Sequence, residues 1–133
     1  MLAKANRVVS GADFRSIVRT GRRASTPLAV VYSTHTGETP TRFGFIVAKS
    51  VGGSVVRNRM RRRLRAIGSE LLTERSTGVD VVVRPLPGSA EQTWATLHTQ
   101  VIDAVHQSVG KHGIQKQRST AEAQRRDWQG RRC

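Results

Sequence analysis

The pattern of apolar and polar positions predicts strands in the first two thirds of the chain. Residues 27–33 (PLAVVYS) and 42–49 (RFGFIVAK) are rich in strand-forming residues, and 78–85 (GVDVVVRP) is a third such run, ended by proline. Residues 22–26 allow a short edge strand. The polar segment 34–41 (THTGETPT) is expected to be an exposed connection.

A first helix is predicted to begin after Ser10, a good N-cap residue, with Asp13 in its first turn. Val9 is placed to pack against Phe14 as a hydrophobic staple, and Gly21 supplies a C-terminal stop. The helix is therefore short.

A middle helix is predicted across 54–67 (SVVRNRMRRRLRAI). At about 100° per residue its apolar positions fall within one arc, which consists of Val56, Met60, Leu64, Ile67 and Leu71. That arc must be buried, whereas six arginines occupy the flanks and the outer face without an acid among them. Arginines one turn apart repel each other, and each such pair destabilises an isolated helix by about 0.2–0.5 kcal/mol.

A last helix is predicted from the capping-box spacing of Ser89 and Gln92. Apolar residues then recur at intervals of three and four, at Trp94, Leu97, Val101 and Val105. Gly110 is expected to close this helix. Residues 111–133 have seven basic residues against two acids and little apolar period, so we expect a folded domain over 1–110 and a basic, disordered tail over 111–133.

Charge and composition narrow the class of partner. The 133 residues include 23 Lys and Arg against nine acids, which gives a formal net charge of +14, and the natural partner of so basic a chain is a polyanion. The single cysteine, Cys133, excludes a disulfide framework within one chain. No apolar run is long enough for a secretory signal or a membrane span. We expect a cytoplasmic protein with no membrane partner.

Two interpretations of the arginine helix are open at this point. A charge run is commonly a solvated helix face, but such faces usually mix signs. Guanidinium groups fit phosphate oxygens in bidentate geometry and release counterions on binding, so a nucleic acid is favoured. The sequence supplies no zipper, zinc site or helix-turn-helix spacing, so RNA is the expected partner and no DNA is expected.

No catalytic site is predicted in the chain itself. The histidines lie scattered, at His35, His98, His106 and His112, and none has the ligand pattern of a zinc site. Glu70 and Glu74 are expected to be a solvent-exposed pair, and no serine lies in a nucleophile elbow. We therefore expect no metal site and no catalytic residue here.

Blocks in a fixed order carry a resemblance to a known family. The stretch 43–67 (FGFIVAKSVGGSVVRNRMRRRLRAI), preceded by 12–23 (ADFRSIVRTGRR) and followed by 78–85, resembles the protein subunit of bacterial ribonuclease P over about residues 2–108. The resemblance implies an α+β two-layer sandwich in the order α-β-β-β-α-β-α. It also implies a left-handed strand-helix-strand crossover, against the general preference for right-handed ones.

The resemblance also implies a function. The chain would be the protein half of a ribonucleoprotein endonuclease that removes the 5′ leader from precursor transfer RNA. Its RNA subunit would hold the catalytic centre, with magnesium ions bound mainly by that RNA. The alternative is a non-enzymatic structural RNA-binding protein, such as a ribosomal or ribosome-assembly protein, and a nucleoid-type DNA binder is a more distant one.

Site residues follow from the resemblance position by position. The signature implied to dock on the catalytic RNA corresponds to Lys49, Arg57, Asn58, Arg59, Arg61, Arg62 and Arg65. A cleft between the first helix and the sheet, implied to hold the leader, corresponds to Phe14 and Tyr32, whose rings can stack on unpaired bases. Packing is the alternative for both rings. It stays equally open for Phe14, whereas the hydroxyl of Tyr32 favours a wet edge and hence the cleft.

The chain departs from the family pattern at a few positions. Ser50 stands where members often carry a lysine, and Val18 where they often carry an aromatic residue. Leader stacking is therefore expected to be weaker here. Trp128 lies outside the resemblance and is interpreted as incidental.

Overall fold

The computed structural model describes residues 2–118, and the side chains of residues 2–110. These residues form the helices α1 (Gly11–Thr20), α2 (Ser54–Glu74) and α3 (Trp94–Arg118), and the strands β1 (Arg22–Ser25), β2 (Ala29–Pro40), β3 (Arg42–Phe45) and β4 (Thr77–Pro85). Short 3-10 helices, η1 (Lys4–Asn6), η2 (Lys49–Val51) and η3 (Ser89–Glu91), lie between them. The predicted order α-β-β-β-α-β-α is confirmed, including the short edge strand.

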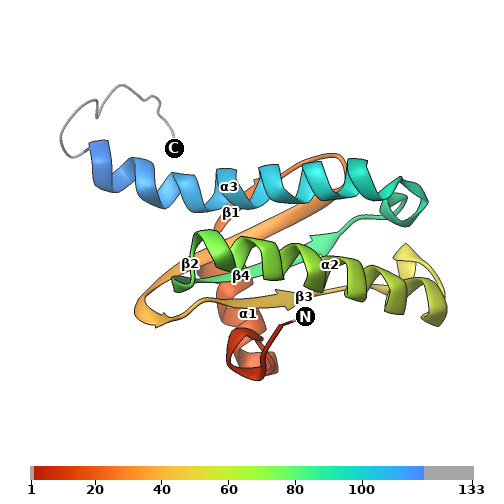
Figure 1. The fold of residues 1–133 in the computed structure, drawn as a ribbon, viewed down its shortest axis with the longest axis horizontal. Coiled ribbons are helices and arrows are strands. Elements are labelled where there is room, and N and C mark those ends of the chain that lie inside the picture. The colour runs from red at the N-terminus through yellow and green to blue at the C-terminus, as the bar shows by residue number, and fades with distance from the viewer. Residues whose placement is uncertain (1, 119–133) are drawn as a thin grey trace.

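The strands form one sheet in the order β1-β2-β4-β3. Both β1 and β4 pair antiparallel with β2, whereas β3 lies parallel to β4 at an edge of the sheet. A parallel pair needs a crossover connection, and α2 provides it. In Figure 1, β3 and β4 both run from left to right with β4 above β3, and α2 lies in front of them, so the crossover is left-handed as expected.

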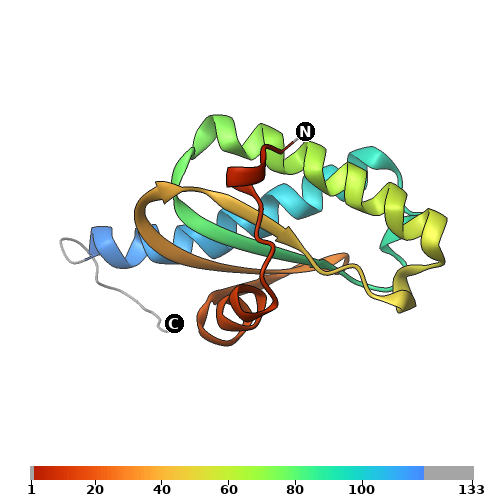
Figure 2. The same cartoon turned by 90° about the horizontal axis from the view of Figure 1, so that it is seen from below.

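Helices cover both faces of the sheet. Figure 2 shows α1 on one face and α2 on the other, and α3 packs on the same face as α2. The helices α2 and α3 run in the same direction (Figure 1). The sheet therefore has a larger core under α2 and α3 and a smaller one under α1.

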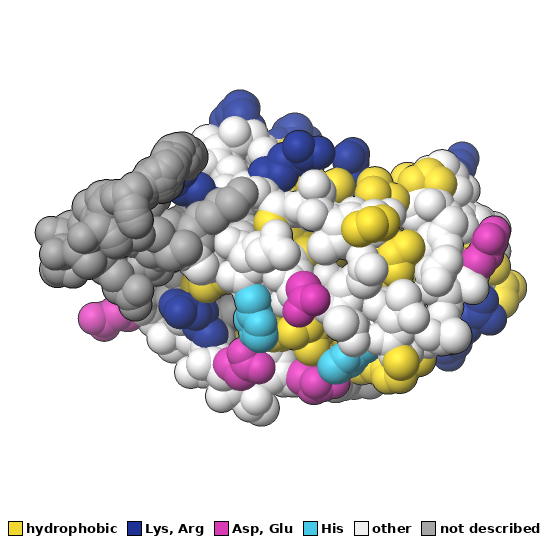
Figure 3. Space-filling model, turned by 90° about the horizontal axis from the view of Figure 1, so that it is seen from above, with side chains coloured by type: hydrophobic (Ala, Val, Ile, Leu, Met, Phe, Trp, Pro, Cys, Tyr) yellow, Lys and Arg dark blue, Asp and Glu magenta, His cyan; other side chains and the backbone are white. Residues whose placement is uncertain are grey.

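Two glutamate–histidine pairs join α2 to α3 at the surface. Nε2 of His98 lies 2.9 Å from Oε2 of Glu70, and Nε2 of His106 lies 2.9 Å from Oε1 of Glu74. Figure 3 shows carboxylates and histidines side by side on this part of the surface. The expected exposure of Glu70 and Glu74 is confirmed, but each also has a partner in α3, which no local pattern could indicate.

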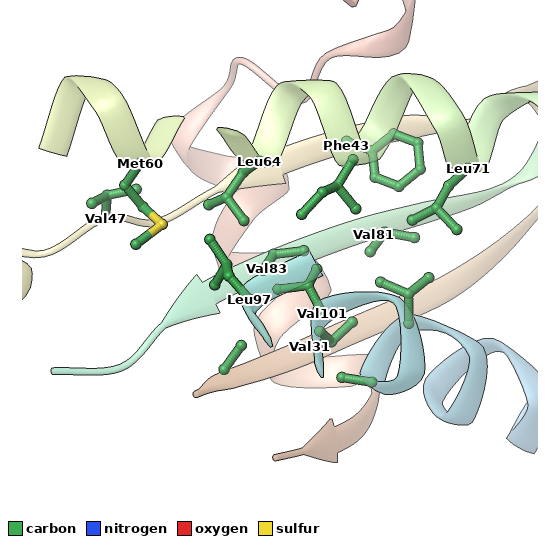
Figure 4. Close-up of a cluster of buried hydrophobic side chains, with 14 of the residues drawn as sticks. Val31, Phe43, Val47, Met60, Leu64, Leu71, Val81, Val83, Leu97 and Val101 are labelled. Atoms are coloured by element: carbon green, nitrogen blue, oxygen red, sulfur yellow. The ribbon is translucent and has the colours of Figure 1, made fainter. Parts of the chain in front are cut away.

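The larger core anchors α2 on the sheet (Figure 4). It combines Met60, Leu64 and Leu71 of α2 with Val31, Phe43, Val81 and Val83 of the strands and with Leu97 and Val101 of α3. The predicted apolar arc is buried, since Met60, Leu64 and Ile67 are at most 2% exposed, although Val56 at its start is half-buried. Full burial of one such side chain contributes about 1.5–3 kcal/mol, so this face fixes the orientation of the helix.

The smaller core lies between α1 and the sheet. It consists of Val8, Ile17, Val30, Tyr32 and Val82, with Phe14 and Val18 packed against it. Ser10 caps α1 as predicted, because its Oγ accepts hydrogen bonds from the backbone N–H groups of Ala12 and Asp13 at 3.1 and 3.4 Å. The end of α1 before Gly21 is also confirmed.

The predicted staple between Val9 and Phe14 is wrong. The backbone N–H of Val8 donates to the carbonyl of Phe43 at 3.0 Å, so the segment before α1 runs extended beside β3. Side chains alternate along extended backbone. Val8 therefore points into the smaller core, whereas Val9 points outward and is 71% exposed.

Arg42 ties α1 to the sheet. Its Nε and Nη2 donate to the two carboxylate oxygens of Asp80 at 3.0 and 2.7 Å, and its Nη1 donates to Oδ2 of Asp13 at 3.2 Å. The hydrogen bond to Asp80 raises the pKa of the Arg42 guanidinium above its usual value, against the opposing effect of burial. Asp13 of α1 and Asp80 of β4 are thus held by one cation.

The expected exposed connection over 34–41 is wrong. β2 continues to Pro40, with His35 opposite Val79 and, after an irregularity, Pro40 opposite Thr77. The first residues of β4 supply backbone partners here. The segment is therefore part of a strand, although the last four residues of β2 are exposed. Strand pairing of this kind leaves no apolar pattern in the sequence.

Both predicted ends of the last helix are wrong. The helix begins at Trp94, where Oγ1 of Thr93 accepts from the N–H of Thr96 at 3.2 Å, whereas Ser89 is buried in η3. It continues past Gly110 to Arg118, because a glycine inside a helix costs only about 1 kcal/mol relative to alanine. The predicted tail thus begins within α3, and residues 119–133 lie outside the described residues. The domain boundary at residue 110 stays a prediction.

Candidate nucleic-acid interface

The six arginines of α2 have no carboxylate partner among residues 2–110. Two of them donate to neutral oxygens: Nε of Arg57 to the carbonyl of Gly52 at 3.1 Å, and Nη1 of Arg61 to Oδ1 of Asn58 at 3.3 Å. A guanidinium has five N–H donors, so most donors of these side chains are available to a ligand. The first turn of α2 also contains no acid, and its N-cap makes no side-chain hydrogen bond.

Helical spacing divides these arginines between three sides of α2. Arg57, Arg61 and Arg65 recur every four residues and form one row. A second row, Arg59 and Arg63, lies on the opposite flank, which faces α3. Asn58 and Arg62 are exposed on the outer face between the rows.

A groove of about 200 Å³ opens beside the first row. The residues that line it come from the segment before α1, from α1, β3 and α2, and they are Arg7, Val8, Val9, Phe14, Phe43, Gly44, Phe45, Arg61 and Arg65. The structure thus brings Phe14 together with Arg61 and Arg65. The resemblance had assigned these residues to two separate surfaces.

Phe14 lies against the backbone of β3 because Gly44 has no side chain. A Cβ at Gly44 would be 2.5 Å from Cε1 of Phe14 and 3.0 Å from Cβ of Val8, which is too close for any side chain. The Phe14 ring is half-buried, packs against the smaller core and also lines the groove. Both alternatives for this residue, core and cleft wall, therefore describe part of its surface.

Tyr32 lies on the same face of the sheet but is not among the residues that line the groove. It is 8% exposed and belongs to the smaller core, with Arg23 and Val82 opposite it on the neighbouring strands. A ring so buried presents little surface to a base in this conformation. The wet edge expected for Tyr32 is not observed, and its place in a leader cleft stays a prediction.

Lys49, the remaining predicted site residue, is not among the residues that line the groove. It is exposed at the start of η2, and Ser50 and Val51 separate it from the glycine pair that leads into α2. Sequence reasoning missed Arg7 and Val8, which line the groove beside β3. The alternation of exposed Arg7 with buried Val8 was the only signal, and it is too short to be recognised alone.

A second hollow lies away from the groove. A hollow of about 270 Å³ between α2, α3 and β4 is lined mainly by apolar side chains and contains none of the predicted site residues. Within the described residues, no three His, Cys, Asp or Glu side chains are grouped to hold a metal ion. In the same residues, no helix has the length and apolar character needed to cross a membrane.

Known proteins similar to this chain share one description. A family model described as Ribonuclease P matches residues 2–109. A ribonuclease P protein component from Clavibacter michiganensis is 48% identical over 110 residues, which cover 82% of this chain and 97% of that protein. Another from Pseudarthrobacter chlorophenolicus is 42% identical over 124 residues, covering 92% and 90%.

Solved structures show the same fold. The RNase P protein of Staphylococcus aureus has a TM-score of 0.68 at 23% identity and covers 77% of this chain and 94% of its own. That of Thermotoga maritima has a TM-score of 0.66 at 24% identity, covering 73% and 92%. Because the family model spans most of the sequence and the curated relatives exceed 40% identity, the chain belongs to the ribonuclease P protein family.

Proposed function

We propose that this chain is the protein subunit of ribonuclease P, that α2 docks it on the catalytic RNA, and that the groove beside α2 guides the 5′ leader of precursor transfer RNA. Family membership supports the first part, because the relatives are named ribonuclease P protein components. One observation carries the rest: arginines without carboxylate partners border a groove that contains an aromatic ring.

Docking on the RNA subunit is assigned to the outer face of α2. Arg62 and Asn58 are exposed there, and a guanidinium can bind two phosphate oxygens at once. Burial of the opposite face holds the helix rigidly, so its arginines are presented in a fixed row. Each phosphate contact also releases counterions, which gives binding a strong salt dependence.

Leader binding is assigned to the groove. A single strand of varied sequence needs cations that follow its backbone and a ring on which any base can stack. Arg61 and Arg65 supply the cations, and the half-buried ring of Phe14 supplies the stacking surface. This arrangement would distinguish precursor from mature transfer RNA, which has no leader.

Hydrolysis of the phosphodiester is assigned to magnesium ions held mainly by the RNA subunit. The described side chains do not fit a magnesium site of their own, because no three potential ligands are grouped and the groove is lined by arginines. We derive no catalytic step from this chain. Its contribution is to bind and orient the substrate.

Reconstitution with a transcript of the ribonuclease P RNA tests this function. The protein is expected to raise the affinity of the complex for precursor transfer RNA and to leave the affinity for mature transfer RNA nearly unchanged, with duplex DNA as a weak competitor. Equal effects on both transfer RNAs would contradict leader binding. The alternative, a structural RNA-binding protein, is tested by purifying the protein from cells and sequencing the RNA bound to it. Ribosomal RNA would support this alternative, whereas one structured RNA would support the ribonuclease P subunit.

A further inference from the structure

Trp94 is an exposed aromatic side chain at the start of α3. Among the described residues the large exposed hydrophobic ones are Val9, Val55 and Trp94, and the last two lie in the first turns of α2 and α3. Trp94 is 40% exposed, whereas the described phenylalanines and Tyr32 are buried or half-buried. In a chain with 5% aromatic residues, an exposed indole is a candidate for binding.

Contacts between α2 and α3 place Trp94 close to the second arginine row. The ring centroids of Trp94 and His98 are 5.5 Å apart, and His98 contacts Glu70 of α2. Arg63 precedes Glu70 by about two helical turns on the same flank. Because the two helices run in the same direction (Figure 1), Trp94 lies level with the stretch of α2 between Arg63 and Glu70.

Charge changes sign along this junction of the two helices. At its start, Arg59 and Arg63 have no carboxylate partner among residues 2–110. Further along, Glu70 and Glu74 lie at the surface with their histidine partners (Figure 3). An anionic partner would therefore bind at the arginine end of the junction and be repelled beyond Glu70. The acid nearest to Trp94 in sequence is Glu91, which is exposed in η3.

We propose that Arg59, Arg63 and Trp94 form a second RNA-binding surface, on which the indole of Trp94 stacks on an unpaired base of the RNA subunit. Arg63 and Arg59 bind phosphates of the strand that leads from that base along α2. Stacking on an aromatic ring tolerates any base, and arginine adds to it through its planar cation. The inference rests on the proposed function of the chain.

Charge and position select this occupant. The surface lies on the flank of α2 opposite the groove with Phe14, so a leader bound in the groove would not reach it. A protein partner is disfavoured, because the centre of a protein interface is depleted in charged residues, whereas Arg59 and Arg63 lie on the flank of α2 nearest to Trp94. The RNA subunit, which α2 already contacts, is the polyanion within reach.

Tryptophan fluorescence tests the stacking directly. The only other tryptophan is Trp128, so the full-length Trp128→Phe variant reports on Trp94 alone. Titration with the RNA subunit is expected to quench its emission and to protect it from acrylamide. Titration with a single-stranded leader oligonucleotide is expected to leave both nearly unchanged, because that strand binds in the groove.

Substitutions supply the matching affinities. Trp94→Ala is expected to weaken binding of the RNA subunit by about 5- to 100-fold, the range for removal of one stacked base, whereas Trp94→Phe keeps a ring and stays within a few fold. Trp128→Phe is the matched control and should not change affinity. The double variant Arg59→Gln, Arg63→Gln should lower the log–log salt slope by roughly 0.7–0.9 for each phosphate that is no longer neutralised.

The possible outcomes separate this surface from the function on which it rests. Unchanged emission of Trp94 in a complex that forms with full affinity would overturn the inference, even if Trp94→Ala failed to fold. If the emission of Trp94 were quenched as protein concentration rises in the absence of RNA, and sedimentation showed a dimer, the surface would bind a second copy of this chain and the inference would be overturned. Failure of the unsubstituted protein to bind the RNA subunit would instead refute the proposed function.

Discussion

Arg42 on β3 and the arginines of α2 use the same side chain in opposite ways. Arg42 contacts two carboxylates, one of them bidentate, and its role is to hold α1 on the sheet. The α2 arginines beside the same edge strand contact no carboxylate of the described chain. Arg42 has its counter-charges within the fold, whereas the row on α2 has none among residues 2–110 and is open to a polyanion.

Burial explains why both arrangements are stable. The side chain of Asp80 is 9% exposed, and an unpaired charge at such a depth costs several kcal/mol. The α2 arginines are exposed or half-buried, so water solvates them until a ligand binds. The exposed arginines therefore cost the fold little desolvation energy and retain a strong electrostatic preference for a polyanion.

The largest expected effect comes from breaking the Arg42 pair. Asp80→Ala leaves the guanidinium with Asp13 alone, and we expect a decrease of about 3 kcal/mol in the free energy of unfolding, measured by urea denaturation. RNA affinity per folded molecule should be unchanged. Glu38→Ala, which removes an exposed carboxylate, is the control and should stay within about 0.5 kcal/mol. If the free energy of unfolding decreased by less than about 1 kcal/mol in Asp80→Ala, the Arg42–Asp80 pair would contribute no more than an exposed ion pair. Arg42 and the α2 arginines would then not differ in their importance for stability.

The converse effect is expected for Arg61, Arg62 and Arg65 replaced together by glutamine. Each phosphate that is no longer neutralised should lower the log–log salt slope by roughly 0.7–0.9, through Arg62 for binding of the RNA subunit and through Arg61 and Arg65 for binding of precursor transfer RNA. For precursor transfer RNA the two lost contacts amount to about 25- to 60-fold in affinity at about 0.1 M salt. Stability should not fall, because these side chains form no ion pair and their mutual repulsion is removed.

Arg75→Gln provides a control for this triple variant, since Arg75 is exposed at the far end of α2. It should change the salt slope by less than any single substitution in the row. If the triple variant bound RNA with the same affinity and slope as the unsubstituted protein, the row would be a solvated helix face.

A smaller effect is expected for the ring in the groove. Phe14→Ala should weaken binding of precursor transfer RNA by about 1–3 kcal/mol, the contribution of one stacked base, and leave mature transfer RNA nearly unaffected in filter binding with the reconstituted complex. Tyr32→Ala should instead lower the melting temperature, because that ring is buried. A selective decrease in precursor binding in the Tyr32 variant would move the leader path from the groove to the sheet face.

Local periodicity accounts for what the sequence predicted correctly. The buried arc of α2 and the strands predicted at 42–49 and 78–85 repeat within a few residues, so the pattern alone identifies them, although the first of these strands ends at Phe45 and Lys49 lies in η2. The family resemblance added the left-handed crossover, which no periodicity contains. The polar end of β2 was missed because its stability comes from pairing with β4, not from its own side chains.

The groove could not be predicted in the same way. Phe14 and Arg61 are far apart in the sequence, and they meet because β3 lies at the sheet edge and Gly44 lets the ring approach the strand. The position of Trp94 beside the second arginine row likewise depends on how α3 packs along α2. Sequence reasoning identified Phe14, Arg61 and Arg65 of the groove and Arg59 of the second row, but it missed Arg7 and placed Trp94 in the apolar stripe of the last helix, whereas Trp94 is 40% exposed.

The smallest expected effect comes from removing residues 119–133. This segment contains four arginines and two acids, so the formal net charge falls from +14 to +12, and the row on α2 and the groove keep all their side chains. RNA affinity should fall by about two- to fivefold with little change in salt slope. The melting temperature should shift by less than about 3 °C. A shorter chain ending after Gly110 retains Val109, the last of the described α3 side chains that packs against the larger core, and should fold as well. If either truncation lowered the melting temperature by about 10 °C or more, the tail would have to stabilise the folded domain. Its basic residues would then have a structural role like that of Arg42, and not a ligand-binding role like that of the α2 arginines.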